Sequence, residues 1–277
     1  MSERVFIATI WLGAGVVTAL FLWLLGDLMW QGASHLSWSF LVSDTADSGR
    51  SGGIAAILVS TLLILAVALL AAIPLGLLSA VWLTEYTRRD GALGAAVRLS
   101  LDVLAGVPSI VFGLFGNAFF SVYLGLGFSI VSGGLTLACM ILPIFIRTSE
   151  AGLSAVSDDW RRNAAALGMS RASVLWHVLL PAAAPAMAAG LMLGVGRATA
   201  ETAALIFTSG YVDRMPSSLL DSGRALAVHI YDLSMNVTGG DPAAYASALV
   251  LIVLIVAINT GAWALSDRWL ARKVSYA

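Results

Sequence analysis

Residues 185–207 read PAMAAGLMLGVGRATAETAALIF, an apolar stretch that contains two charges, Arg197 and Glu201. One helix through this stretch is long enough to cross a bilayer, and it would carry both charges on one face because they are four residues apart. Gly190 and Gly194 fall on the same stripe, where small residues let a second helix approach closely. The stretch therefore predicts a membrane helix whose charged face looks into a helix bundle and away from lipid.

The whole chain has the composition of an integral membrane protein. Its 277 residues are 59% hydrophobic and 11% charged, and the mean hydropathy is +0.91, which is too apolar for a soluble domain. We therefore predict an all-α membrane protein with six transmembrane helices. The six apolar runs are Val5–Trp30, Ile54–Leu83, Val103–Leu126, Ser129–Ile146, Pro185–Phe207 and Ser247–Leu265. Residues 1–50 would form the first helix and an outer loop, and residues 51–277 a core of five helices.

The basic residues predict the orientation. An even number of spans places both termini on one side, and eleven of the fifteen Lys and Arg residues lie in segments on that side. Cytoplasmic loops carry such a positive excess, so both termini are predicted to be cytoplasmic, with the chain in a bacterial inner membrane. Arg197 is then a basic residue within a span. Cys139 is the single cysteine, which excludes a disulfide framework within the chain.

Motifs that carry chemistry are missing from the sequence. Lys273 is the single lysine, whereas a nucleotide-binding phosphate loop needs a lysine inside a glycine loop. His35, His177 and His229 are far apart, and none has the spacing of metal ligands. No nucleophile motif is present either. We therefore expect no catalytic residues, no metal site and no cofactor, with the histidines in loops or interfaces. A partner would have to supply any energy.

The segment 147–184, between the fourth and fifth spans, is too regular for a linker. We predict one helix over 151–167, a break at Gly168 and a second helix that is capped by Ser170 and runs toward Leu180. Pro181 and Pro185 would then turn the chain back into the membrane. A helical hairpin lying on the inner leaflet is the alternative that the residues themselves leave open.

The spacing in this segment resembles the cytoplasmic coupling loop of ATP-binding-cassette (ABC) importers. That loop has Glu-Ala-Ala, then a Gly, and thirteen residues later the Pro of Ile-x-Leu-Pro. Gly168 and Pro181 keep this interval, and the segment ends VLLP over 178–181, with Leu180 before the proline. Arg162 stands where the motif has Glu, and Asn163 and Ala164 follow it. The polar contact that the Glu would make with an ATPase subunit is therefore in doubt.

Three further stretches are similar to the membrane subunits of phosphate importers. They are GGI at 52–54 with IPLG at 73–76 and TEY at 84–86, AGVPSIVFGLFG at 105–116, and GRA at 196–198 followed by ETA at 201–203. The short N-terminus and HIYD at 229–232 are more similar to the A subunit (PstA-like) than to its longer C partner. The resemblance runs from about Gly52 to the C-terminus and implies a type I ABC importer permease for inorganic phosphate.

The resemblance also implies partners. They are a homologous second permease subunit (PstC-like), a dimer of ATPase subunits (PstB-like) and an outer phosphate-binding protein (PstS-like), besides membrane lipid and phosphate itself. No nucleic acid is expected. Glu85, at the inner end of the second span, is expected to be a solvated charge.

The substrate path is predicted from charge. The planar fork of Arg197 suits two oxygens of phosphate, and Glu201 can accept the proton that phosphate, unlike sulfate, still carries. The resemblance implies that Arg147 is a second basic residue on the exit path, whereas its position at the end of a span also fits an anchor at the interface. Pro108 and Ser109 would begin a helix whose free amides face the anion, or else mark a kink.

Three other functions compete with this hypothesis. The chain could be a permease for sulfate, molybdate or another oxyanion. A secondary transporter that moves protons through Glu201 would need no ATPase, and it leaves the coupling-loop spacing unexplained. A structural membrane scaffold is favoured only if Arg197 tolerates an apolar substitution. As an alternative to the substrate path, the Arg197–Glu201 pair could be an ion pair that only holds the bundle together.

Overall fold

The computed structural model describes residues 3–88 and 91–274 and, for 265–274, only the course of the main chain. The long helices are α1 (Glu3–His35), α3 (Ala55–Val81), α6 (Ile130–Ala155), α9 (Leu180–Thr199) and α12 (Asp241–Val274). The shorter α-helices are α2 (Trp38–Val42), α4 (Ala92–Ala105), α5 (Ser109–Gly116), α7 (Asp158–Ala166), α8 (Arg171–Val174), α10 (Ala203–Ile206) and α11 (Leu226–Met235).

Short irregular helical pieces and one small hairpin complete the chain. A 3-10 turn, η1 (Asp47–Gly49), lies between β1 (Thr45–Ala46) and β2 (Ser51–Gly52), which pair antiparallel. The π-helical turns are η2 (Trp82–Tyr86), η3 (Asn117–Tyr123) and η4 (Leu175–Leu179). Apart from the hairpin, all regular secondary structure in the described part of the chain is helical, so the predicted all-α class is confirmed.

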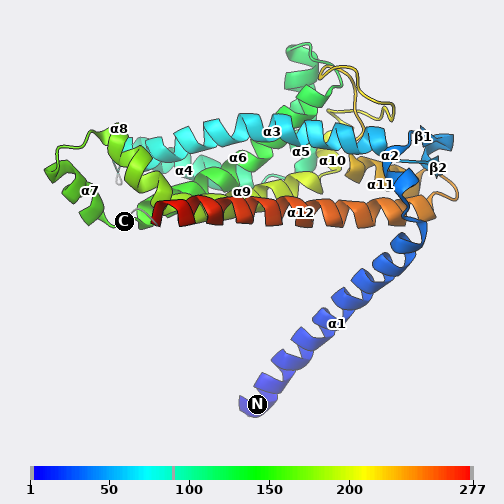
Figure 1. Ribbon diagram of the computed structural model, residues 1–277, viewed down its shortest axis with the longest axis horizontal. Helices are drawn as coiled ribbons and strands as arrows, with labels where there is room; N and C mark the ends of the chain where they lie inside the picture. Colours follow the sequence, from blue (N-terminus) through cyan, green and yellow to red (C-terminus); the bar gives the residue numbers. More distant parts are fainter. Residues whose placement is uncertain (1–2, 89–90, 275–277) are drawn as a thin grey trace.

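Four long helices lie alongside one another and form the bundle (Figure 1). α6 packs between α3 and α9, and α12 packs on α9 and α11. Buried apolar side chains from these helices form the main core, among them Ile64, Leu137, Ile141 and Ala198. Because α6 contributes the largest share of this core, it is the element against which the predicted site residues are placed.

The two ends of the bundle differ. One end carries α7 and α8, together with the end of α12, and we call it the α7 end (Figure 1). The opposite end carries the β1–β2 hairpin, α2 and α11, and we call it the hairpin end. α6 and α9 run in opposite directions between these ends, so α9 leads away from the α7 end.

The first predicted span is confirmed as a long apolar helix, but it leaves the bundle. α1 diverges from the other helices toward its N-terminus (Figure 1), and none of its most apolar window is buried. Near its C-terminal end it does touch α12, where a Cβ on Gly32 would lie 2.7 Å from the Tyr245 carbonyl oxygen. The apolar surface of α1 therefore faces outward along most of its length.

The third predicted span is not one straight helix. α4 ends at Ala105, and the chain then bends by 103° into the α5–η3 segment, Ser109–Tyr123. The bend lies at Pro108, which has no backbone N–H to continue the ladder of α4 and which instead precedes α5 as its N-cap residue. In the part of the chain that the structure describes, five helices are long and apolar enough to span a membrane, or six if the bent pair counts as one span.

The fifth predicted span is also wrong in its limits. α9 begins at Leu180 and continues η4, so Pro181 lies in the first turn of a membrane helix and does not end the preceding loop. α9 stops at Thr199, and α10 starts at Ala203. Arg197 therefore lies in the last helical turn, and Glu201 lies in the break.

The loop predicted at 147–184 is shorter than expected, because α6 continues through Arg147 to Ala155. The expected helix over 151–167 is split in two. Its first part belongs to α6, and α7 begins only at Asp158, after Ser157, whose side chain accepts a hydrogen bond from the Asp159 amide. The predicted break at Gly168 and the cap at Ser170 are both found, since Ser170 precedes α8 and accepts from the Ser173 amide.

Candidate functional site

Arg197 lies in the last turn of α9, a candidate membrane helix, and pairs with none of the residues that the structure describes. Its side chain is partly buried, and among the residues that the structure describes no hydrogen bond or ion pair reaches it. Glu201 does not approach it, because the break after Thr199 removes the helical register that would pair residues four apart. Glu201 Oε1 instead accepts a hydrogen bond of 3.4 Å from the Ala204 amide, at the start of α10. The charges predicted to pair are thus separate.

The glycine stripe on α9 faces α6. A Cβ on Gly190 would overlap the hydroxyl group of Thr148, and a Cβ on Gly194 would lie 2.8 Å from Ile141 Cγ2. These two positions let the backbones of α9 and α6 approach closely. Gly190 lies against Thr148, which follows Arg147 in α6, so Gly190 marks the level of Arg147 along α9. Arg197 comes seven residues after Gly190, which is a rise of about 10 Å along α9 toward the hairpin end.

Pro108 and Ser109 lie where α5 begins. Pro108 has an extended backbone as the N-cap residue, and its carbonyl oxygen accepts the Val111 amide at 3.0 Å. α5 packs on α10, where a Cβ on Gly113 would lie 2.8 Å from Ala204 Cα. The start of α5 therefore belongs to the same region as Glu201. No hydrogen bond within the described ranges joins Arg197 to Pro108 or Ser109.

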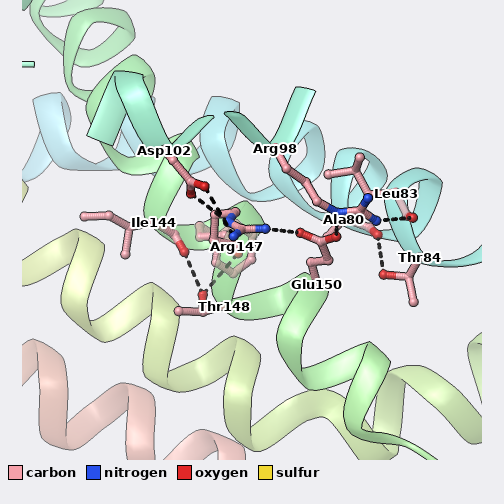
Figure 2. A network of polar contacts seen from close by, with 10 residues as sticks. Ala80, Leu83, Thr84, Arg98, Asp102, Ile144, Arg147, Thr148 and Glu150 are labelled. Atoms are coloured by element: carbon pink, nitrogen blue, oxygen red, sulfur yellow. Dashed lines mark hydrogen bonds and ion pairs between the residues drawn. The ribbon is translucent and has the colours of Figure 1, made fainter. Parts of the chain in front are cut away.

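Arg147 sits in a network of four charged side chains on α4 and α6 (Figure 2). Its Nη1 lies 2.9 Å from Glu150 Oε2, and its Nε lies 3.0 Å from Asp102 Oδ1. Arg98 Nε lies 2.5 Å from Glu150 Oε1, and Arg98 Nη2 donates to the Leu83 carbonyl oxygen at 3.3 Å. Two guanidinium groups and two carboxylates therefore balance one another between the helices.

The two carboxylates of this network differ in exposure. The Glu150 side chain is 8% exposed and pairs with both arginines, whereas the Asp102 side chain is 54% exposed and, within the described ranges, pairs with Arg147 alone. Removing one partner from a buried charged group leaves the other charge uncompensated, at a cost of about 3–5 kcal/mol. Glu150 is consequently a fixed element of the structure, and Asp102 is a weaker contact that water can replace.

Sequence reasoning missed Arg98, Asp102 and Glu150. One signal was available for Glu150, because it follows Arg147 by three residues and such pairs meet on a helix. Arg98 and Asp102 come from another helix about fifty residues earlier, and no local pattern predicts that pairing.

A second ion-pair contact, between Arg161 and Glu85, holds the segment after α6, and we call this pair the clamp. Arg161, on α7, places Nη2 2.7 Å from Glu85 Oε1 and donates to the carbonyl oxygens of Leu153 and Val156. Both side chains of the ion pair are 21% exposed. The expectation that Glu85 is merely a solvated charge is wrong, since this carboxylate joins η2 to α7. A cavity of about 280 Å³ lies beside the clamp and is also lined by Met169 and Arg171.

The predicted coupling-loop residues lie around this clamp. Arg162 is exposed and pairs with Asp159 at 3.0 Å on α7 itself, and Ala164 is buried. Gly168 has a φ of +75°, a left-handed conformation that glycine adopts without strain. Leu180 is buried at the start of α9, next to Pro181. Asn163 accepts the Leu167 amide through its backbone carbonyl at the end of α7.

A third polar cluster lies at the hairpin end, on α11 and the segment before it. Arg224 pairs with Asp232 at 3.1 Å and donates to the Tyr211 carbonyl oxygen at 2.8 Å. His229 is fully buried beside Arg224, contrary to the loop or interfacial position expected for it. Burial, and next the positive charge of Arg224, lower the pKa of His229 from 6.5 to about 4.

Together these positions provide two guanidinium groups at different depths, Arg197 and Arg147, and an anchored loop at the α7 end. Guanidinium groups bind oxyanions through paired N–H donors. Within the described ranges no group of three or more His, Cys, Asp or Glu residues is placed to hold a metal ion. The guanidinium group of Arg197, partly buried in the bundle, is chemically able to hold an anion.

The sequence matches the family described as "binding-protein-dependent transport system inner membrane component" over residues 72–275. A "probable ABC transporter permease protein YqgI" of Bacillus subtilis (strain 168) is 29% identical, over 94% of this chain and 92% of that protein. A "phosphate transport system permease protein PstA 1" of Mycobacterium tuberculosis (strain CDC 1551 / Oshkosh) is 31% identical, over 81% of this chain and 74% of that protein.

Solved structures agree in fold. The crystal structure of a bacterial alginate ABC transporter, in complex with its alginate-bound periplasmic protein, contains a chain that superposes with a TM-score of 0.67. The superposition covers 98% of the present chain and 99% of that one, at 15% sequence identity. At this identity the similarity shows the arrangement of helices and nothing of the substrate. The predicted architecture of a type I importer permease is confirmed.

Proposed function

Because the chain belongs to the family of binding-protein-dependent transport system inner membrane components, we propose that it is the PstA-like permease subunit of an ATP-driven importer of inorganic phosphate. As a member of this family it is a multi-pass inner-membrane transport subunit and not an enzyme. The relatives named PstA support phosphate as its substrate. The chain would form half of the translocation path.

The observation that carries this proposal is Arg197. A charged side chain within a membrane segment costs at least about 2.5 kcal/mol, so such residues pair with one another or line a polar path. Arg197 has no ion-pair partner among the described residues, although Glu201 is only four positions away. A phosphate anion has the negative charge and the paired acceptor oxygens that a partner for this guanidinium group needs.

We propose that Glu201 makes the path selective for phosphate over sulfate. Because its carboxylate accepts only one weak hydrogen bond, from the Ala204 amide, it has capacity for a further donor. Phosphate at neutral pH still carries a proton that it can donate, whereas sulfate does not. The N-terminus of α5 at Pro108 and Ser109 would add backbone amides to the same region.

The α7 segment is proposed as the contact with the ATPase partner. Trp160, Leu167 and Trp176 are exposed there, at 53%, 81% and 62%, around the anchored α7 helix. Exposed apolar side chains in a cluster favour a protein partner. Residues Arg162 to Pro181 would transmit ATPase closure to α9, which continues directly from η4. A PstC-like permease, a PstB-like ATPase dimer and a PstS-like binding protein would complete the importer.

Uptake of labelled phosphate tests the proposal. Cells whose only high-affinity importer carries Arg197→Gln should lose at least tenfold in uptake, with normal membrane level and normal association with the ATPase. Arg50→Gln is the matched control, because Arg50 is exposed at the hairpin end and pairs only with Asp47. Normal uptake by Arg197→Gln would refute the role of Arg197.

Competition separates the two oxyanion hypotheses. Unlabelled phosphate should block uptake, and sulfate or molybdate at the same concentration should not. Glu201→Gln should weaken this discrimination. If Glu201→Gln left both the uptake and the preference unchanged, the proton-acceptor role would be refuted.

A further inference from the structure

We propose that Asp102 and the transported oxyanion compete for Arg147, so that the Asp102–Arg147 ion pair is a latch that the anion itself opens. The proposal rests on the proposed function, because it requires an anion in the path. It adds a positioning role for Glu150 and a gating role for Asp102. The four residues of the latch network, Arg98, Asp102, Arg147 and Glu150, are drawn in Figure 2.

The first step of the argument is the difference between the two carboxylates. Glu150 is buried and held from both sides, by Arg98 at 2.5 Å and by Arg147 at 2.9 Å. It therefore keeps the Arg147 guanidinium group in place whichever other partner is bound. Among the described residues, Arg147 is the one partner of the Asp102 side chain, which is 54% exposed. Of the two carboxylates, Asp102 is the exchangeable one.

The second step is the geometry of the exchange. Arg147 offers Asp102 two N–H groups, with Nε 3.0 Å from Oδ1 and Nη2 3.5 Å from Oδ2. A tetrahedral oxyanion presents two oxygens to a guanidinium group in the same paired manner. Because the Asp102 side chain is exposed, it can turn away from Arg147 as the anion binds. Arg147 keeps Glu150 throughout the exchange and has either Asp102 or the anion as its second negative partner.

The third step is the position of Asp102 in the chain. It lies three residues before the end of α4, close to the 103° bend that leads into α5. Its ion pair to Arg147 therefore ties the bend to α6. The other described ion pair between α4 and α6, Arg98–Glu150, lies one turn earlier, and most residues of α4 are exposed, so the end of α4 after Arg98 depends on Asp102. Release of Asp102 would free the end of α4, and the pair is a two-state element of the kind that gates use.

The fourth step is the order of the two arginines. Arg147 lies nearer the α7 end than Arg197 does, by about 10 Å along α9. An anion that moves from the hairpin end toward the α7 end meets Arg197 first and the latch second. The anion would thus release Asp102 from Arg147 only after it has left Arg197.

The test uses the assembled importer in liposomes and measures the separation of α4 and α6. In a Cys139→Ala background, spin labels on Ser100→Cys (α4) and Ser154→Cys (α6) report this distance, since both positions are exposed. Asp102→Asn should lengthen the distance without any anion, and it should raise ATP hydrolysis in the absence of binding protein severalfold. Asp102→Glu should keep the short distance.

Asp47→Asn is the matched control. Asp47 is 57% exposed and pairs with a single arginine, as Asp102 does, but it lies at the hairpin end. It should change neither the distance nor the hydrolysis. A distance in Asp102→Asn that equals that of Asp47→Asn would overturn the latch.

Inorganic phosphate and sulfate then test the competition. Phosphate should lengthen the distance in the protein with Asp102 intact, and it should add little in Asp102→Asn. No response to phosphate in the protein with Asp102 intact would refute the competition. If sulfate or molybdate lengthened the distance where phosphate did not, the latch would stand, and phosphate as the proposed substrate would be refuted. The effect of Asp102→Asn without anion does not depend on the substrate.

Discussion

Arg161 Nη2 lies 2.7 Å from Glu85 Oε1, and this ion pair connects α7 with η2 across seventy-six positions of the sequence. The same guanidinium group also donates to the Leu153 and Val156 carbonyl oxygens, where α6 ends. One side chain therefore joins three segments at the α7 end. A movement of α7 would be transmitted to α3 and α6 through this residue.

Arg161→Gln should loosen α7. The substitution removes the charge that satisfies Glu85 and the two carbonyl oxygens, and leaving such groups unpaired costs about 1–3 kcal/mol. We expect a lower melting temperature of the purified protein in detergent and faster proteolysis within residues 156–170. Arg162→Gln is the control, because its pair with Asp159 is 75% and 70% exposed and contributes at most about 1 kcal/mol. Equal effects of the two substitutions would contradict the clamp.

Gly190→Ala should separate α9 from α6. A Cβ at this position would overlap the Thr148 hydroxyl group, so one of the helices must shift, and overpacking of this kind costs about 1–3 kcal/mol. Gly196→Ala is the matched control on the same helix, since a Cβ there meets nothing within 4 Å. Alanine also favours a helix over glycine. The melting temperature should fall for Gly190→Ala and stay level or rise for Gly196→Ala; the reverse order would contradict the packing described.

The membrane helices could be predicted because an apolar run of about twenty residues has few other uses. The end of α9 at Thr199 could not. Residues 203–207 are apolar after the break, and neither glycine nor proline occurs at 200–202 to mark it. The prediction that Arg197 and Glu201 share one helical face assumed a continuous helix. Because the helix breaks after Thr199, the predicted pairing is wrong. A hydropathy pattern predicts that a segment lies in the membrane, but it does not predict whether the helix through that segment is unbroken.

The charged networks show a second limit of the sequence. Arg98 and Glu150 are fifty-two positions apart, and their contact depends on how α4 lies on α6. Gly168, in contrast, was predictable from local chemistry, because a glycine between two helical patterns is the usual signal of a left-handed turn. A backbone conformation such as the left-handed turn at Gly168 can therefore be predicted from the residues next to it in the sequence. Long-range ion pairs are set by the packing of helices.

Acid should destabilise the hairpin end through His229. Its pKa is about 4 in the folded protein against 6.5 ordinarily, because burial and Arg224 disfavour the charged ring. The unfolded chain therefore binds a proton that the folded protein does not, and stability falls as the pH is lowered from about 6.5 to about 4. At about 1.4 kcal/mol for each tenfold change in proton affinity, the loss approaches 3 kcal/mol. Above pH 7 the stability that His229 contributes is fully present.

Melting temperatures between pH 4 and pH 8 measure this effect. His229→Gln should flatten the fall between pH 6.5 and pH 4, because glutamine does not titrate. His177→Gln is the control, since His177 is exposed on η4 and should leave the pH dependence unchanged. An unaltered acid fall in His229→Gln would place its cause elsewhere.

Gly168→Ala should strain the turn between α7 and α8. Gly168 has a φ of +75°, and a Cβ there meets nothing within 4 Å, so any cost arises from the backbone conformation alone. For a residue with a Cβ, the left-handed conformation costs about 1–2 kcal/mol, whereas asparagine adopts it more readily. Gly168→Ala should therefore lower the melting temperature more than Gly168→Asn does. If α7 also couples to the ATPase partner, phosphate-stimulated ATP hydrolysis by the assembled importer should fall in the same order. Equal behaviour of the alanine and asparagine variants would show that the turn does not depend on this conformation.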